Sequence, residues 1–104
     1  MTHTGAMFRH VVMFEWVDGV DSADIDAMAA ALDALVATLP EVVSYVHGPD
    51  AGLAEGNFDY VMVGDYASAE DYAVYRDHPE HQRIIAEMIK PHVAKRAAVQ
   101  YTTA

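Results

Sequence analysis

The 104-residue sequence has no cysteine, which excludes disulfide bonds, thiolate catalysis and cysteine-ligated metals. It also has little positive charge, since six lysine and arginine residues face sixteen acidic ones and the formal net charge is −10. A surface this negative repels phosphate backbones and anionic headgroups, so we expect neither nucleic acid nor membrane as a partner. No apolar run approaches the roughly 20 residues that span a bilayer. Because no export signal is recognisable either, we expect a cytoplasmic protein.

The length suits one domain with one core and leaves no room for a separate cofactor-binding domain. We expect residues 1–6 to form an N-terminal tail and residues 7–104 to form the domain. The charges are uneven: residues 1–75 contain thirteen acids and one base, whereas residues 76–104 contain three acids and five bases. This cationic last quarter either complements acidic parts of the fold or forms a site for anionic small molecules.

Four segments are rich in β-branched and aromatic residues and are predicted to be strands: 8–16, 42–48, 60–66 and 94–101. Between the first two, apolar residues recur at spacings of three and four up to Leu39, which predicts a helix with one buried stripe. Asp21 or Ser22 can cap this helix, and Pro40 ends it. The second and third strands can pair as a hairpin with a long, glycine-containing loop.

A second helical region precedes the last strand. Ser68 can cap a short helix that ends near Tyr75. Proline disfavours helical backbone in the residue before it but suits the first position of a helix, so His78 is predicted to cap a new helix that runs from Pro79 towards Lys90. The order strand, helix, strand, strand, helix, strand predicts an α+β fold, a ferredoxin-like sandwich with a four-stranded antiparallel sheet and helices on one face.

The first predicted strand is apolar on both faces, with His10, Phe14 and Trp16 on one of them. Helices can cover only one face of the sheet, and we expect the other face to expose Phe14, Trp16 and their neighbours. An apolar patch of that size is not typical of a soluble monomer. The sequence therefore predicts a homodimer whose sheets pack face to face into a barrel that encloses a cavity. An RNA-recognition sheet would need a basic surface that this chain lacks.

Residues 75–83, YRDHPEHQR, concentrate proton-transfer groups at a predicted helix start. The helix dipole disfavours the cationic form of His81 there, so this histidine can accept a proton and Tyr75 can serve as its partner. The pair is a candidate for acid–base catalysis without a cofactor. In the alternative interpretation, His78 and Pro79 serve the helix start and His81 only packs. The spacing of the two histidines also permits a shared metal, but no third ligand has a recognised spacing and we expect none.

The other histidines differ in their surroundings. A histidine such as His10, on an apolar strand face, is usually a hydrogen-bonded core residue, but at the wall of the predicted cavity it can orient a polar ligand. Phe14 and Trp16 are predicted to bind the apolar part of the same small molecule. His47, beside Gly48, and His92 look like turn and helix-end residues and are assigned no role.

Taken together, the segments RHVV, FDY and HPEH, with the later KPH, resemble the stress-responsive dimeric α/β-barrel (Dabb) family over nearly the whole chain. The resemblance implies a ferredoxin-like protomer and a homodimer. The family includes a plant polyketide cyclase that makes olivetolic acid, in which a tyrosine and the second histidine of a Y-x-x-H-P-x-H segment are regarded as the acid–base residues. Tyr75 and His81 match these positions, His10 matches a pocket histidine, and Tyr60 stands in the place of another pocket histidine.

Three functions remain open from the sequence. The first is a cofactor-independent enzyme that acts on an enolisable carbonyl or polyketide-like compound, with His81 as general base and Tyr75 as proton partner. The second is a non-catalytic stress-response or assembly protein whose dimer is the functional form. The third is a relative of the cofactor-independent monooxygenases that share this architecture.

Overall fold

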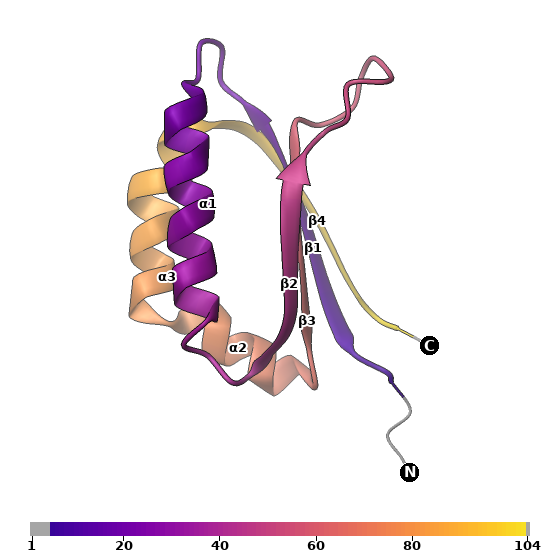
Figure 1. Ribbon diagram of the computed structural model, residues 1–104. Coiled ribbons are helices and arrows are strands. Elements are labelled where there is room, and N and C mark those ends of the chain that lie inside the picture. Colours follow the sequence, from indigo (N-terminus) through magenta and orange to yellow (C-terminus); the bar gives the residue numbers. More distant parts are fainter. Residues whose placement is uncertain (1–4, 104) are drawn as a thin grey trace.

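The computed structural model describes residues 5–103 and has two layers, a four-stranded antiparallel sheet and a group of helices on one side of it (Figure 1). The strands are β1 (Phe8–Trp16), β2 (Val42–Pro49), β3 (Tyr60–Tyr66) and β4 (Val93–Thr102), in the spatial order β2-β3-β1-β4. Every neighbouring pair is antiparallel. The predicted ferredoxin-like sandwich and the hairpin of β2 with β3 are therefore confirmed. Residues 1–4, most of the predicted tail, lie outside the described residues.

The first helix, α1 (Ser22–Val36), begins where its cap was predicted, because the Asp21 side chain accepts a hydrogen bond from the Ala23 N–H at 2.9 Å. Its end was predicted too late. The chain leaves the helix after Val36, and the Thr38 N–H and hydroxyl both turn back to the Leu35 carbonyl. Leu39 still packs against the core from this turn, which explains why its apolar spacing resembled a continuing helix.

Helix α2 (Ala69–Asp77) is capped by Ser68, whose Oγ accepts from the Asp71 N–H at 3.1 Å, and it ends two residues beyond Tyr75. His78 then caps α3 (Pro79–Ile84), since its Nδ1 accepts from the Glu80 N–H at 3.1 Å. Figure 1 shows α1 and α3 side by side on one face of the sheet, with α2 across one end. The helical region is thus divided at Pro79, as the sequence predicts.

The helix predicted from Pro79 towards Lys90 is present, but only its first part is α-helical. After α3 the chain forms a π-helical turn over Ile85–Ile89 and a 3₁₀ turn over Lys90–His92. Pro91 has no N–H, and its ring clashes with the carbonyl four residues earlier in an α-helix, so the last turn must change its pitch. The Lys90 N–H accordingly bonds to the Ile85 carbonyl, five residues back. Such π-turns occur frequently at functional sites.

The assignment of the sheet faces also needs correction. Phe14, expected on the uncovered face, is 3% exposed and lies under the helices together with His10 and Val12. Trp16 packs on the rings of Phe14 and Tyr60, with centroids 5.5 and 5.7 Å away. Alternation correctly grouped these side chains on one face, but both faces of β1 are apolar, so the pattern alone did not say which face the helices cover.

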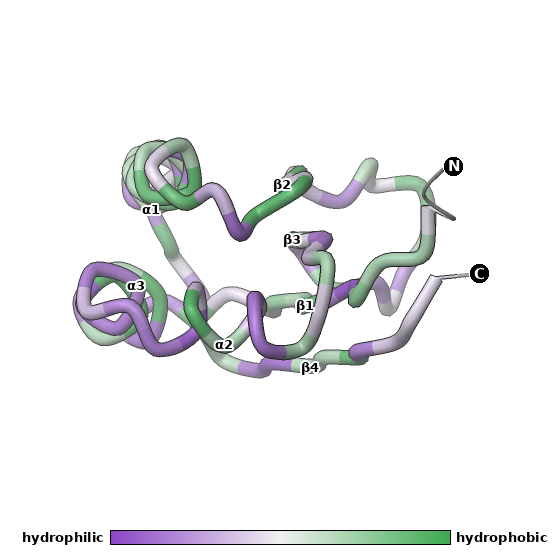
Figure 2. The backbone as a smooth tube through the Cα atoms, turned by 90° about the horizontal axis from the view of Figure 1, so that it is seen from below, coloured by the Kyte–Doolittle hydropathy of each residue, from purple (hydrophilic) through white to green (hydrophobic). Residues whose placement is uncertain are grey.

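The uncovered face carries both apolar and charged side chains. One valine from each strand forms a row across the sheet: Val46, Val63, Val11 and Val99. The adjacent row is polar, and in it the Arg9 guanidinium donates to both carboxylate oxygens of Asp65, at 2.7 and 2.9 Å. Figure 2 views the layers from below and shows the helices all on the opposite side of the sheet. An apolar band therefore crosses the free face.

Candidate functional site

A cavity of about 450 Å³ lies between the sheet and the helices. Strands β1, β3 and β4 form its floor, and α2, α3 and the π-turn form its other walls. The polar and aromatic residues that line it are His10, Phe14, Tyr72, Tyr75, Arg76, His81, Lys90 and Arg96. The structure thus brings four of the predicted site residues together in one cavity: His10, Phe14, Tyr75 and His81.

His81 is 8% exposed and its ring is held in one tautomer. Its Nδ1 lies 3.0 Å from the Arg76 carbonyl oxygen. A carbonyl oxygen only accepts, so Nδ1 carries the hydrogen and Nε2 keeps a free lone pair. Burial lowers the pKa of His81, although the carbonyl opposes that shift. From the sequence, the helix dipole was expected to keep His81 neutral. In the structure, burial is the main cause of its lowered pKa. His81 is therefore an uncharged proton acceptor near pH 7.

Tyr75 is the nearest aromatic neighbour of this histidine. The two rings are 4.0 Å apart between centroids and tilted by 34°. The Tyr75 hydroxyl, however, lies 2.9 Å from the Tyr45 hydroxyl, and it has no hydrogen bond to His81. Burial raises the pKa of Tyr75 to about 12, so the hydroxyl keeps its proton at neutral pH. Tyr75 is consequently a neutral donor beside a neutral base.

Tyr45 was missed by the sequence interpretation. It comes from β2, and its hydroxyl also lies 3.5 Å from the Met62 Sδ. Tyr45 has one proton to give, so two arrangements are possible. When it donates to Tyr75, the Tyr75 proton is free for a ligand; when it donates to the sulfur, it accepts from Tyr75. The alternation of β2, which places Tyr45 and His47 on the same face, was the signal that could have identified it.

His10 has the opposite tautomer. Its Nδ1 lies 3.0 Å from the Gln100 Nε2, an amide group that donates, so Nδ1 accepts and the ring hydrogen is on Nε2. The same amide donates to the Tyr72 hydroxyl at 3.2 Å. Burial lowers the pKa of His10 to about 4, and the charge of Arg96 adds to this. One cavity therefore contains a histidine with a free lone pair and a histidine with a free N–H.

Two predicted ligand contacts, Tyr60 and Trp16, do not line this cavity. The Tyr60 hydroxyl lies 2.6 Å from the Nδ1 of His47, whose Nε2 lies 2.7 Å from the Asp33 carboxylate. This chain of hydrogen bonds joins α1, β2 and β3. His47 accordingly belongs to a strand and to a hydrogen-bond network that reaches from the buried Tyr60 to the exposed Asp33, and its assignment to a turn is wrong. His92 does end the helical region, with its Nε2 3.9 Å from Asp24.

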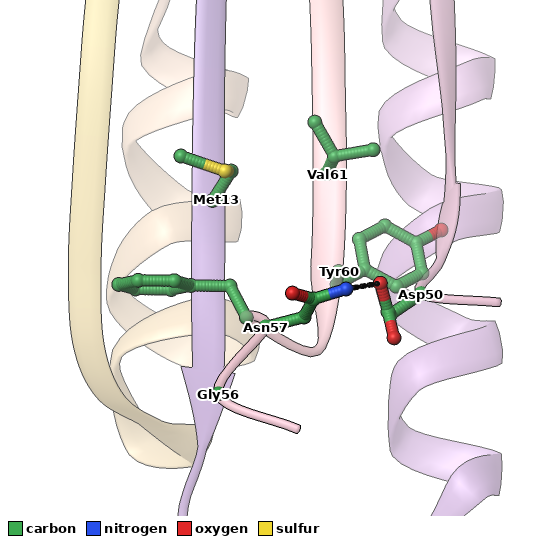
Figure 3. Close-up of a pocket in the computed structure, with 7 residues that line it drawn as sticks. Met13, Asp50, Gly56, Asn57, Tyr60 and Val61 are labelled. Carbon is green, nitrogen blue, oxygen red and sulfur yellow. Dashed lines mark hydrogen bonds between the residues drawn. The ribbon is translucent and has the colours of Figure 1, made fainter. Parts of the chain in front are cut away.

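A second hollow of about 350 Å³ opens on the uncovered face of the sheet (Figure 3). Met13 and Val61 form its base, and the loop before β3 forms its side. There the Asn57 amide donates to the Asp50 carboxylate at 3.1 Å. Tyr60 lines this hollow, but its hydroxyl is bonded to His47. His10, Tyr75 and His81 do not line it, so the hollow does not combine a free base with a proton donor.

Within residues 5–103, no three histidine, aspartate or glutamate side chains come close enough together to hold a metal ion. The same part of the chain has no helix with the length and apolar character needed to cross a membrane.

The strand order and the cavity under the helices define a ferredoxin-like α+β protein. More particularly, the chain belongs to the stress responsive A/B barrel domain family, whose model matches residues 8–103. The resemblance found in the sequence is thereby confirmed. Two curated relatives from Arabidopsis thaliana, both described as stress-response A/B barrel domain-containing proteins, are each 33% identical. The matches cover 86% and 79% of this chain but only 34% and 40% of those proteins, so the chain spans well under half their length.

Solved structures agree on the fold. A dimeric ferredoxin-like protein of unknown function from Thermobifida fusca is 36% identical, with a TM-score of 0.86 over 99% of this chain and 96% of that one. A dimeric protein of ferredoxin-like fold from Bacteroides fragilis is 22% identical, with a TM-score of 0.79 over 93% and 96%. The hydroxynitrile lyase of Passiflora edulis is 20% identical, with a TM-score of 0.82 over 94% of each chain. The last two likenesses show the fold alone.

Proposed function

We propose that this protein is a homodimeric, cofactor-independent enzyme that performs acid–base chemistry on a small molecule with an enolisable carbonyl. The observation that carries the proposal is the pair of opposite tautomers, since His81 has a free lone pair and His10 a free N–H in one cavity. A base and a hydrogen-bond donor on either side of a carbonyl compound are what proton abstraction beside that carbonyl requires. A cavity of about 450 Å³ is of the size usual for small-molecule sites.

The reaction is an intramolecular aldol cyclisation. His81 Nε2 takes a proton from the carbon beside the carbonyl, and the C–H electron pair becomes the C=C bond of an enolate. The growing charge on oxygen is stabilised by the Nε2–H of His10 and by the Tyr75 hydroxyl. The enolate carbon then attacks a second carbonyl of the same molecule, and the imidazolium of His81 protonates the new alkoxide. During this cycle the Arg76 carbonyl, which accepts from Nδ1–H at 3.0 Å, supports the positive imidazolium.

The homodimer is supported by the uncovered sheet face. Val46 and Val99, at the two edge strands, are 59% and 60% exposed, and Val43 is 55% exposed. A row of valines across four strands is an apolar band that a second copy of the chain can cover by an isologous contact. The Thermobifida fusca relative, described as dimeric, matches this chain over nearly its whole length. The active cavity lies on the other side of the sheet, so each protomer has its own.

The second candidate is a non-catalytic stress-response or assembly protein. The observation in its favour is that His81 is 8% exposed, stacks on Tyr75 and bonds to a backbone carbonyl, as a purely structural histidine also does. The two candidates differ in the consequence of removing the imidazole: in an enzyme the reaction is lost, whereas in a structural role only stability is lost.

Deuterium exchange tests the proposal. The protein is incubated in D₂O with an enolisable ketone that carries an apolar group, such as phenylacetone, and loss of the methylene signal is followed by NMR. We expect wild type to accelerate exchange and His81→Gln to reduce that acceleration by about 10²-fold or more. His92→Gln, which alters a histidine outside the cavity, is the matched control and should change nothing. Equal acceleration by wild type and His81→Gln would contradict the proposal, as would oxygen consumption in place of exchange, which favours the monooxygenase interpretation.

A further inference from the structure

The cavity is cationic in a strongly anionic protein. The net charge is −10, yet the cavity lining includes three basic residues, Arg76, Lys90 and Arg96, and no aspartate or glutamate. Both histidines in the lining are held neutral by burial, so they do not contribute this charge. Three of the five basic residues that follow residue 75 therefore line one concave surface. Such focusing raises the local concentration of anions.

The three bases are not equivalent. The Arg76 guanidinium donates to both carboxylate oxygens of Asp77, at 2.8 and 3.0 Å, so its charge is largely compensated. Lys90 and Arg96 form no ion pair or side-chain hydrogen bond with any residue between 5 and 103. If the cationic last quarter only complemented acidic parts of the fold, these two side chains would have acidic partners. They instead lie exposed at the cavity rim.

Their positions place both side chains on the same cavity as His10 and His81. Arg96 lies opposite Phe14 in the pairing of β4 with β1, and so it is on the same face as His10. The charge of Arg96 is also the second cause, after burial, of the lowered pKa of His10, so its field reaches that ring. Lys90 follows the π-turn, which brings Ile85, Ile89 and Lys90 to the same cavity. In a regular α-helix Ile85 and Ile89 would still share a face, but Lys90, five residues after Ile85, would be turned away from it.

Apart from Tyr72 and Tyr75, the rest of the lining is apolar: Val12, Phe14, Met62, Ile85, Ile89 and Val93. A ligand that matches the whole cavity has an apolar body and a single anionic group. A guanidinium binds a planar carboxylate through two parallel hydrogen bonds, and an ammonium adds a point charge.

We infer that the cavity takes an apolar or aromatic small molecule that carries a carboxylate, held by Arg96 and Lys90 at the rim. This inference rests on the proposed function, because it places the carbonyl to be enolised deeper in the same cavity, between His81 and His10. The inference adds the substrate class, a keto acid with an apolar body. Its carboxylate stays at the rim, so that its ketone end points into the cavity. Recognition by the two cations is separate from proton transfer, so the two can be tested separately.

Matched pairs of acids and amides test the inference by binding alone. The dissociation constants of 4-phenylbutyrate and its uncharged twin, 4-phenylbutanamide, are measured by calorimetry with wild-type protein. We expect the acid to bind about tenfold more tightly than the amide, as a partly exposed, charge-assisted contact allows, with a difference that shrinks as salt is added. Equal affinities in wild type would overturn the inference. Tighter binding of phenyl phosphate than of 4-phenylbutyrate would overturn the assignment to carboxylates.

Variants assign the effect to residues. Arg96→Gln and Lys90→Gln should each remove most of the preference for the acid, and Arg96→Lys should retain part of it. Lys95→Gln is the matched control. Lys95 also forms no ion pair with any described residue, and it lies outside the cavity lining. In the strand register it stands opposite Glu15. An equal loss in Lys95→Gln would mean that only net charge matters, and would contradict the inference. Melting temperatures confirm that each variant is folded.

The same experiment separates this inference from the proposed function. His81→Gln should lose deuterium exchange and keep the preference for the acid, because the carboxylate contacts the rim. A wild-type protein that accelerates exchange in neutral ketones but binds acids and amides equally would refute the carboxylate site and leave the acid–base proposal standing.

Discussion

The hydroxyl groups of Tyr75 and Tyr45 lie 2.9 Å apart, although the ring of Tyr75 is stacked on His81. The ring face of Tyr75 thus contacts His81, the candidate base, and its hydroxyl contacts Tyr45 from the edge strand β2. In the proposed reaction this arrangement gives Tyr45 a positioning role: when Tyr45 donates to Tyr75, it leaves the Tyr75 proton available for a ligand. Its hydrogen bond also opposes the rise that burial causes in the pKa of Tyr75.

Tyr45→Phe should therefore reduce ketone deuterium exchange by about tenfold, less than Tyr75→Phe, because the donor remains but is no longer oriented. A role in stability alone would lower the melting temperature without changing the exchange rate per folded molecule. Exchange kinetics and thermal unfolding of Tyr45→Phe, Tyr75→Phe and the double variant distinguish these roles. If the double variant is no slower than Tyr75→Phe, the two hydroxyls act as a unit; if the single losses multiply, the positioning role is refuted.

Stability should fall as the pH is lowered from about 6.5 towards 4. His10 has its ordinary pKa of 6.5 when unfolded and about 4 when folded, and the pKa of His81 is shifted in the same direction. In this window the unfolded chain binds more protons, so stability rises with pH, by at most about 1.4 kcal/mol per pH unit for each histidine. Above about pH 7.5 both states are largely neutral and the contribution is flat.

Urea unfolding of wild type and His10→Gln at several pH values checks this slope. The variant should lose part of the dependence between pH 5 and 6.5, where the carboxylates have already ionised. An identical slope in both proteins would contradict the burial of a neutral His10.

Tyr66 has an unused hydroxyl. It is fully buried, and among residues 5–103 its oxygen is the one buried side-chain polar atom without a hydrogen-bond partner. Tyr66→Phe removes the cost of that unpaired group and should be neutral or stabilising by about 1 kcal/mol. Chemical denaturation measures the change. A loss of more than about 1 kcal/mol would show that the hydroxyl has a partner in solution.

The same ring explains Gly64. A Cβ at this position would lie 2.7 Å from the Tyr66 hydroxyl and 3.0 Å from its ring edge, and the buried ring has no room to move. Gly64→Ala should cost about 1–3 kcal/mol of unfolding free energy. Gly48→Ala is the matched control, since a Cβ there meets nothing within 4 Å. Equal effects of the two substitutions would refute the steric explanation.

If the valine row forms the dimer interface, a charged residue introduced there should disrupt the dimer. Val63→Asp, in the centre of the row, should convert the dimer to a monomer by placing a carboxylate in an apolar contact. Val74→Asp, on α2, introduces the same charge at a position 44% exposed and away from the sheet, and should leave the dimer intact. Native mass spectrometry measures both. A Val63→Asp protein that is still dimeric, or a wild-type monomer, would contradict the proposed interface.

Much of the fold could be predicted from local patterns. The strand boundaries, the cap at Asp21 and the division at Pro79 each depend on residues close in sequence, and the structure has them within a few positions. Which face of the sheet the helices cover could not be predicted from local patterns, because β1 is apolar on both faces. The π-turn before Pro91 also needed the structure, since an irregular pitch leaves no distinct spacing of apolar residues.

The candidate site could also be predicted only in part. Tyr75 and His81 stand six residues apart and could be paired from the sequence. The groups that set their chemistry come from distant strands: Tyr45 from β2 for the tyrosine, and Gln100 from β4 for His10. No local signal links Gln100 to His10, ninety residues away. The sequence therefore indicated which side chains could transfer protons but not which ring nitrogen each histidine leaves free.

Those nitrogens provide the most direct test of the account. Long-range proton–nitrogen NMR correlation of the histidine rings at pH 7, assigned with His10→Gln and His81→Gln, reports which nitrogen of each ring carries the hydrogen. We predict that His81 is protonated only at Nδ1 and His10 only at Nε2. A His81 ring that is protonated at Nε2, or at both nitrogens, would leave the cavity without a base and would contradict the proposed chemistry.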